Sequence, residues 1–221
     1  MTHATLNNAL FTLSLLLQLA LLVTLFRKRI VRTYPVFTAL IAFYLLRAIL
    51  LFSIFGHLSP EAYDALYANL SLLDILLQLA TVIELVVHII RSQSRSLLLR
   101  LTPALIAVII ATIATAVVVS RLPARTAIPI DRSQLFLSFL LLLVFLWAAL
   151  TPSPSLLRRL TEGFALNALL TLCAIAGHVL AASHRDARSY TLWSYVAATA
   201  WLLTVTLWLF TLRTPRNMTS T

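Results

Sequence analysis

The sequence predicts an all-α integral membrane protein, a bundle of seven transmembrane helices that forms a single domain over residues 1–221. Of the residues, 61% are hydrophobic and 11% are charged, and the mean hydropathy is +0.96, whereas soluble domains carry about 25% charged residues. This much apolar surface cannot be buried inside a water-soluble domain, so we expect lipid to be the solvent. The second observation is a series of long apolar runs, at approximately residues 6–26, 34–55, 63–90, 97–120, 133–150, 160–182 and 190–212.

Each run is long enough to cross about 30 Å of hydrocarbon as a helix, and none shows the alternation of barrel strands. The first run follows no basic segment and is too long for the apolar part of a cleaved signal peptide, so we expect a retained span. All eight prolines lie in loops or first helical turns, which predicts unbroken helices. The fourth run has a face of small residues suited to close helix packing, namely Ala104, Ala107, Ala111 and Ala114.

The basic residues predict the orientation of the bundle. Five of them, including Arg121, Arg185 and Arg188, lie in the loops on one side of the membrane, and eleven lie on the other side. Since basic residues gather in cytoplasmic loops, we expect the N-terminus outside and the C-terminus in the cytoplasm. Lysine is nearly absent beside many arginines, alanines and leucines, which fits a GC-rich bacterial genome. We therefore expect a multi-pass protein of a bacterial inner membrane. The eleven residues on the expected cytoplasmic side are Arg27, Lys28, Arg29, Arg32, Arg91, Arg95, Arg100, Arg158, Arg159, Arg213 and Arg216.

Two opposite charges lie inside adjacent runs. Arg47 lies in the second run and Asp74 in the third, at similar depths from the short loop that joins these runs. Because an unpaired charge in a membrane is costly, we expect the two to meet. Polar residues continue along one face of the third run, which predicts a helix central to the bundle. That face holds Tyr63, Tyr67, Ser71, Asp74, Gln78, Thr81, Glu84 and His88.

Two interpretations of this pair stay open. It is either a structural clasp between two helices or part of a ligand-binding or proton-relay site with Tyr44, Gln78 and Tyr67. In the second case an arginine fork in a low-dielectric pocket would suit a carboxylate or phosphate ligand.

Glu84 and His88 form a second polar pair, nearer the expected cytoplasmic side. At a spacing of four residues on one helix, their side chains can touch. The pair is either a polar cap that reaches the headgroups together with Arg91, or a group with a proton- or metal-linked role.

Histidines near the expected outer surface are weak candidates for metal ligands. They are His57, His178 and His184, with Glu61 and Asp64 in the same region. These residues lack tight ligand spacing, so a solvated rim is favoured and no metal or cofactor is expected. The single cysteine, Cys173, allows no disulfide within the chain.

Comparison with known seven-helix families excludes two functions. Retinal attachment needs a lysine in the last helix, but the only lysine, Lys28, lies in a loop. The zinc-dependent hydrolases of the adiponectin-receptor type need histidines in the last span, which has none. A set of residues in the second and third runs resembles a group of small uncharacterised bacterial seven-helix membrane proteins. The set consists of the segment Tyr34–Phe37 (Tyr-Pro-Val-Phe) with Tyr44, Arg47, Tyr63, Tyr67 and Glu84. This resemblance implies no activity.

The sequence therefore favours a non-enzymatic module that binds or senses a small ligand, or an accessory subunit of a membrane complex. A small-solute transporter or permease that uses the polar face of the third helix is the alternative. An enzyme is disfavoured because no acid–base pair is flanked by a nucleophile or a clear metal set. The expected partners are the lipid bilayer and either further copies of the chain or a larger complex. The net charge of +10 is explained by topology rather than by nucleic acid.

Overall fold

The structure is a computed structural model that describes residues 3–54, 57–92, 132–150, 154–184 and 186–213. The expected fourth span, residues 97–120, lies outside the described residues, as do its four alanines. Within the described ranges every regular element is helical, which confirms the all-α prediction. The elements are α1 (His3–Arg27), the 3₁₀ helix η1 (Ile30–Arg32), α2 (Pro35–Ile54), α3 (Pro60–Ser92), α5 (Arg132–Leu150), α6 (Ser155–Ser183) and α7 (Ala187–Arg213).

Five of the described helices are long and apolar enough to cross a membrane. They are α1, α2, α3, α6 and α7, whereas α5 has a shorter apolar part, Ser138–Leu150. At 1.5 Å per residue α3 is about 50 Å long, so it must tilt or extend beyond the hydrocarbon. The structure is therefore that of a multi-pass membrane protein.

Local signals explain where the helices begin and end. Pro35 and Pro60 occupy the first positions of α2 and α3. Proline is tolerated there because a backbone N–H at this position would have no partner within the helix. Arg29 has a left-handed backbone (φ 55°) and turns the chain between α1 and η1. Asp186 caps α7 by accepting hydrogen bonds from the backbone N–H groups of Arg188 and Ser189. A hydrogen bond from the Ser189 hydroxyl, together with these two backbone bonds, lowers the pKa of Asp186.

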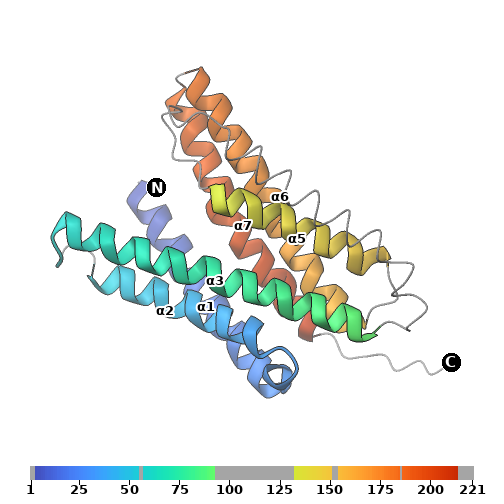
Figure 1. Cartoon of the computed structure of the whole chain (residues 1–221). Coiled ribbons are helices and arrows are strands. Elements are labelled where there is room, and N and C mark those ends of the chain that lie inside the picture. The colour runs from blue at the N-terminus through green and yellow to red at the C-terminus, as the bar shows by residue number, and fades with distance from the viewer. Residues whose placement is uncertain (1–2, 55–56, 93–131, 151–153, 185, 214–221) are drawn as a thin grey trace.

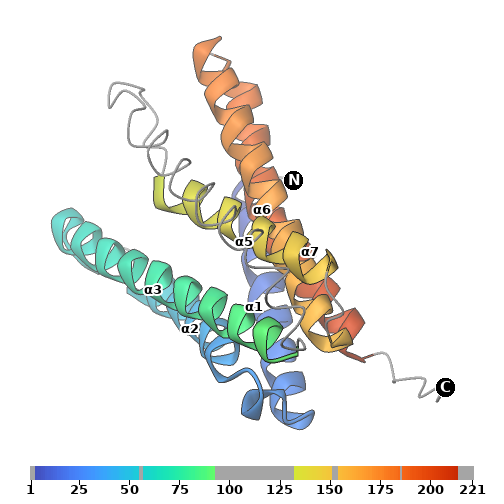
Figure 2. The ribbon, with the colours of Figure 1, turned by 45° about the vertical axis from the view of Figure 1, so that its right-hand side comes forward.

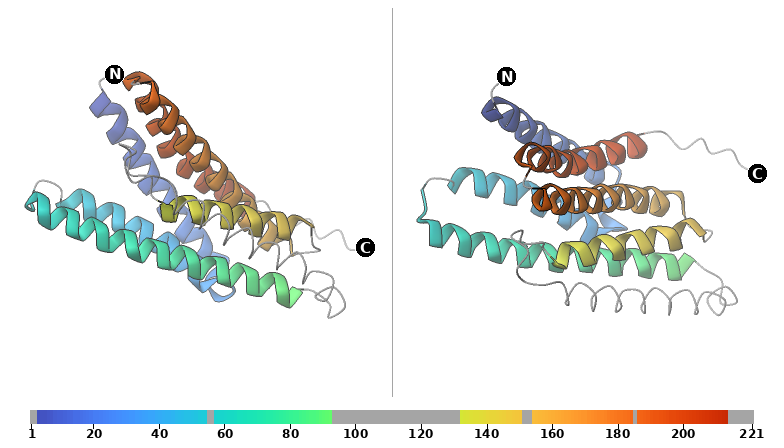
Figure 3. Two further views of the ribbon diagram at one scale, coloured as in Figure 1. Left: turned by 45° about the horizontal axis from the view of Figure 1, so that its top comes forward. Right: turned by 90° about the horizontal axis from the view of Figure 1, so that it is seen from above.

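The helices form two groups with α1 between them (Figures 1 and 2). The hairpin of α2 and α3 lies on one side, and α5, α6 and α7 lie on the other, with α6 packed extensively on both α5 and α7. The first helix, α1, contacts α2 and α7, and α3 contacts α2 and α5. The two groups diverge toward the N-terminus of α1, as the views of Figures 1 and 3 both show.

That the third helix is central to the bundle stays a prediction, because the expected fourth span lies outside the described residues. One side of α3 packs on α2, α5 and α6, and its other side carries exposed apolar residues. The polar face of α3 needs only one protein neighbour and a cavity to be shielded from lipid, and α2 is that neighbour. The exposed residues are Leu72, Leu73, Leu76, Leu79 and Ile83.

We call the end of the bundle where α1, α3 and α7 end and α2 and α6 begin the basic end. Three cross-links hold it together. The Lys28 ammonium donates to the carbonyl of Leu212, the Arg159 guanidinium donates to that of Thr211, and the α2 backbone donates to Glu84. The basic residues that the structure describes here are Arg27, Lys28, Arg29, Arg32, Arg91, Arg158, Arg159 and Arg213.

A buried aromatic cluster lies above this end. Phe37 of α2, Phe164 of α6 and Trp208 of α7 meet edge to face, with ring centroids 4.9–5.7 Å apart. The Trp208 indole donates to the carbonyl of Leu160 at 3.2 Å. A Cβ at Gly163 would overlap this indole, so the glycine is what allows α7 to approach α6. The cluster ties the two groups of helices together.

Candidate functional site

The expected contact between Arg47 and Asp74 is present. Arg47 Nη1 donates to Asp74 Oδ2 at 2.6 Å, and the two side chains are 16% and 17% exposed. The pair joins α2 to α3 where both helices lie within the apolar part of the chain. Each charge therefore compensates the other in a medium where either alone would be costly.

A network of polar groups surrounds the pair. Gln78 Nε2 donates to the second carboxylate oxygen of Asp74 at 2.8 Å and to the hydroxyl of Tyr44 at 2.9 Å. Arg47 Nη2 donates to the Ser71 hydroxyl at 3.3 Å, and its guanidinium carbon lies 5.2 Å from the ring centroid of Tyr67. The structure thus brings all the predicted residues of this site together, with Tyr67 at its half-exposed edge.

A cavity of about 350 Å³ adjoins this network. Arg47, Asn167 and Trp201 each lie twelve residues from the basic-end terminus of their helix, which corresponds to about 18 Å. The cavity is therefore near the middle of the bundle, and residues of all six described α-helices line it. Its polar lining consists of Gln18, Tyr44, Arg47, Asp74, Gln78, Ser138, Asn167 and Thr171.

The lining of the cavity also includes residues that no sequence pattern singled out. Gln18 of α1 is 3% exposed, and its Nε2 donates to the Ser14 hydroxyl at 3.0 Å. Its Oε1 is buried and has no hydrogen-bond partner among the described residues. A buried acceptor without a partner is costly, so this oxygen marks a place where a ligand or water would be stabilised.

Asn167 and Thr171 lie one turn apart on α6 and face the same cavity. Other helical threonines, such as Thr81 and Thr204, donate to the carbonyl four residues earlier. In the described part of the chain no hydrogen bond engages Asn167 or Thr171. Their polar groups therefore remain available to a bound molecule.

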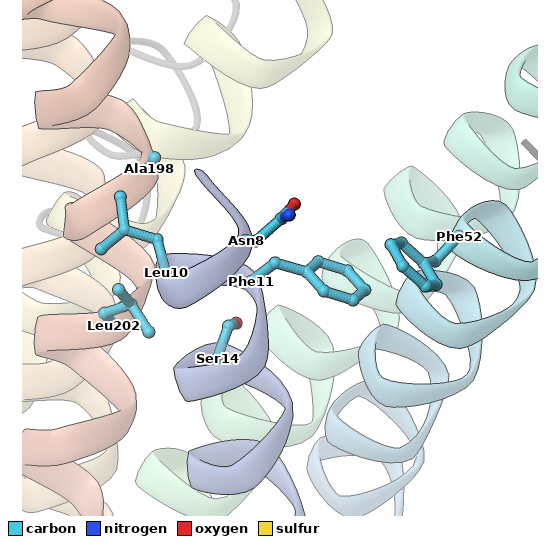
Figure 4. Close-up of a pocket in the computed structure, with 7 residues that line it drawn as sticks. All are labelled: Asn8, Leu10, Phe11, Ser14, Phe52, Ala198 and Leu202. Carbon is cyan, nitrogen blue, oxygen red and sulfur yellow. The ribbon is translucent and has the colours of Figure 1, made fainter. Parts of the chain in front are cut away.

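Aromatic rings lie between the cavity and the basic end. Trp201 packs on Tyr44, with centroids 4.6 Å apart, and lies 5.9 Å from Trp208 of the aromatic cluster. Toward the opposite end a second pocket of about 450 Å³ lies between α1, α2 and α7 (Figure 4). Phe11 and Phe52 stack across this pocket at 4.8 Å, and Ser14, the partner of Gln18, lines it. The two ends of the cavity therefore differ: packed aromatic rings lie toward the basic end, and a second pocket lies toward the opposite end.

The expected pairing of Glu84 with His88 does not form through their side chains. The carboxylate of Glu84 instead accepts hydrogen bonds from the backbone N–H groups of Val36 and Phe37, at 3.0 and 2.9 Å. These donors belong to the first turn of α2 and lack intrahelical partners, which makes them a strong site for an anion. His88 Nδ1 lies 2.8 Å from the backbone oxygen of Glu84.

The ring of His88 packs on Tyr34, with centroids 4.5 Å apart. Burial, and to a smaller extent the charge of Glu84, raises the pKa of Tyr34 to about 12. The phenol therefore stays protonated at neutral pH. Together with Glu84, these residues form a structural junction between the start of α2 and the end of α3.

The weak metal candidates lie apart from the cavity. His178 contacts the Ser194 hydroxyl at 3.0 Å and packs on Tyr190, whereas His57 and His184 are exposed. Within the described ranges no three His, Cys, Asp or Glu residues gather closely enough to hold a metal ion.

Removing the capping carboxylate should destabilise the bundle. We expect Glu84→Ala to cost about 1–2 kcal/mol, because it leaves the first N–H groups of α2 without an acceptor. The thermal unfolding midpoint in detergent should fall by several degrees. Glu162→Ala is the matched control, since it removes an exposed i, i+4 pair with Arg158 and should cost little. An equal effect of the two substitutions would argue against the capping role.

The ion pair should behave as a coupled unit. Arg47→Met or Asp74→Leu alone strands one charge and should cost about 3–5 kcal/mol. The double variant removes both charges and should recover most of that loss in the same thermal unfolding assay. Additive losses would show that the two side chains act independently.

Comparison with known proteins finds no matching family model, no similar curated protein and no similar solved structure.

Proposed function

We propose that this chain is a bacterial inner-membrane protein with seven transmembrane helices that binds a small polar ligand in the cavity beside Arg47 and Asp74. It acts as a non-enzymatic sensing module or as an accessory subunit of a membrane complex. The observation that carries this proposal is the polar cavity at mid-bundle, with an ion pair on one wall and the buried, unpartnered Oε1 of Gln18 on another. Typical small-molecule sites begin at about 300 Å³, so the volume is sufficient.

The proposed orientation has the N-terminus outside and the C-terminus in the cytoplasm. Its support is the gathering of arginine and lysine at the basic end, which is typical of a cytoplasmic face. In this orientation the pocket of Figure 4 faces outward.

The lining favours a neutral ligand over the carboxylate or phosphate that an isolated arginine would suit. The charge of Arg47 is already compensated by Asp74, so an anion would have to displace this partner. The rest of the lining offers an amide oxygen from Gln18 and the neutral groups of Asn167 and Thr171. We therefore propose an uncharged molecule with both donors and acceptors, no larger than about ten waters in volume.

A bound ligand would affect how the helices pack. It would touch α1, α2, α3 and α6 at once, and a ligand shifts a conformational equilibrium by its differential affinity for the two states. A bound ligand would thus change how the two groups of helices pack against each other. A partner protein could detect this change at the basic end.

The alternative is a transporter. The polar face of α3 and the outward pocket favour it. The aromatic cluster of Phe37, Phe164 and Trp208 counts against it, because these packed rings lie between the cavity and the basic end. A sensor needs access from one side, and a transporter needs access from both in turn.

Cysteine labelling separates these possibilities. In a Cys173→Ala background, we expect Thr171→Cys to react with a small membrane-impermeant methanethiosulfonate added from outside and not from the cytoplasm. Reaction requires a hydrated thiolate, which only a water-accessible cavity permits. Ala168→Cys is the control on the same helix, because Ala168 is fully buried and does not line the cavity.

Labelling of Thr171→Cys from both sides would favour the transporter. Absence of labelling from either side would contradict the ligand-binding proposal and leave Arg47–Asp74 as a structural clasp.

A further inference from the structure

A second site of different chemistry lies at the basic end, on the outer surface of α1. There a groove of about 560 Å³ is apolar along its length and cationic at one end. Its apolar part is formed by Leu16, Leu19 and Val23, which lie on one stripe of the helix and are 43–59% exposed. Its polar end holds Arg27, Lys28 and Arg213.

The cations are not compensated by acidic groups. Within the described residues the ion pairs are Arg47–Asp74 and Arg158–Glu162, and neither involves the groove. Glu84, the other described carboxylate of this end, is occupied by the first turn of α2. Three positive charges thus stand together with no carboxylate in the lining.

The chain itself holds these charges in place. Lys28 donates to the carbonyl of Leu212, so the end of α1 is tied to the last turn of α7, beside Arg213. Figure 3 shows α1 beside α7, and the two helices are in contact. The cationic end therefore belongs to two helices that are joined, rather than to one freely moving tail.

The dimensions match one acyl chain and its headgroup. From Leu16 to Arg27 the groove runs for about 16 Å along α1, close to half of a hydrocarbon core of about 30 Å. The apolar spans end at Arg27 and Arg213, which is where a headgroup would lie.

We propose that this groove binds one anionic phospholipid, with an acyl chain along Leu16, Leu19 and Val23 and the phosphate between Arg27, Lys28 and Arg213. Ordinary surrounding lipid would cover the apolar stripe without regard to headgroup charge. The uncompensated cations give the site its preference for a negative headgroup. The site is independent of the ligand proposed for the central cavity.

Native mass spectrometry of the purified protein, titrated with phosphatidylglycerol or with phosphatidylcholine of the same chains, tests this site. We expect one phosphatidylglycerol to bind at least five-fold more tightly than phosphatidylcholine. Each basic residue near an anionic headgroup contributes roughly a five-fold factor, so Arg27→Gln with Arg213→Gln should weaken phosphatidylglycerol binding by about 25-fold. Arg91→Gln removes an exposed charge at the same end of the bundle but outside the groove, and it should change binding little.

Val23→Trp provides a second variant, which fills the apolar part and leaves every charge in place. It should also weaken phosphatidylglycerol binding, and inorganic phosphate at the same concentration should bind far more weakly than the lipid. Equal binding of the two lipids, or an equal loss with Arg91→Gln, would overturn the proposal. So would phosphate binding as tight as that of the lipid, because the acyl chain would then play no part.

Discussion

The ion pair between Arg47 and Asp74 constrains the rest of the bundle. Both charges lie in helices that are apolar enough to cross a membrane, and either charge alone would cost several kcal/mol there. Their contact requires α2 and α3 to pack as antiparallel neighbours at a fixed register. Gln78 and Tyr44 then complete the hydrogen bonding of the carboxylate. The register of the hairpin follows from the need to keep one carboxylate satisfied.

The ion pair also affects the space beside it. A charged and polar wall packs poorly against leucine, so the helices that face it present Gln18, Asn167 and Thr171. These residues and the ion pair line a cavity of about 350 Å³. The aromatic cluster packs rings of α2, α6 and α7 together nearer the basic end, while the two groups of helices diverge toward the other end (Figure 2). The proposed one-sided access rests on this contrast.

The features predicted from the sequence are those with a strong local signal. The helices follow from long apolar runs, and the contact of Arg47 with Asp74 follows from opposite charges at matched depth on neighbouring helices. The partner of Glu84 could not be found in this way, because the N–H groups of Val36 and Phe37 are backbone donors that every helix start possesses. A spacing of four residues suggested His88 instead, and the orphan donors of α2 compete more strongly.

Gln18, Asn167 and Thr171 were overlooked for a different reason. Neutral polar residues in membrane helices usually satisfy themselves within their own helix, as Thr81 and Thr204 do. Only the packing of the helices in space shows that these three residues line one cavity. The weak signal that was available is the presence of amide side chains, Gln18 and Asn167, within otherwise apolar runs.

The central claim is that the space beside Arg47 is a ligand site. The most direct measurement is an experimental density map of the protein in lipid, taken at the cavity between Arg47 and the wall of Gln18 and Asn167. We predict discrete density for a small molecule or ordered water that reaches the Oε1 of Gln18 and leaves the Arg47–Asp74 contact intact. A cavity filled by protein side chains, with Gln18 Oε1 bonded to a protein donor, would contradict this claim.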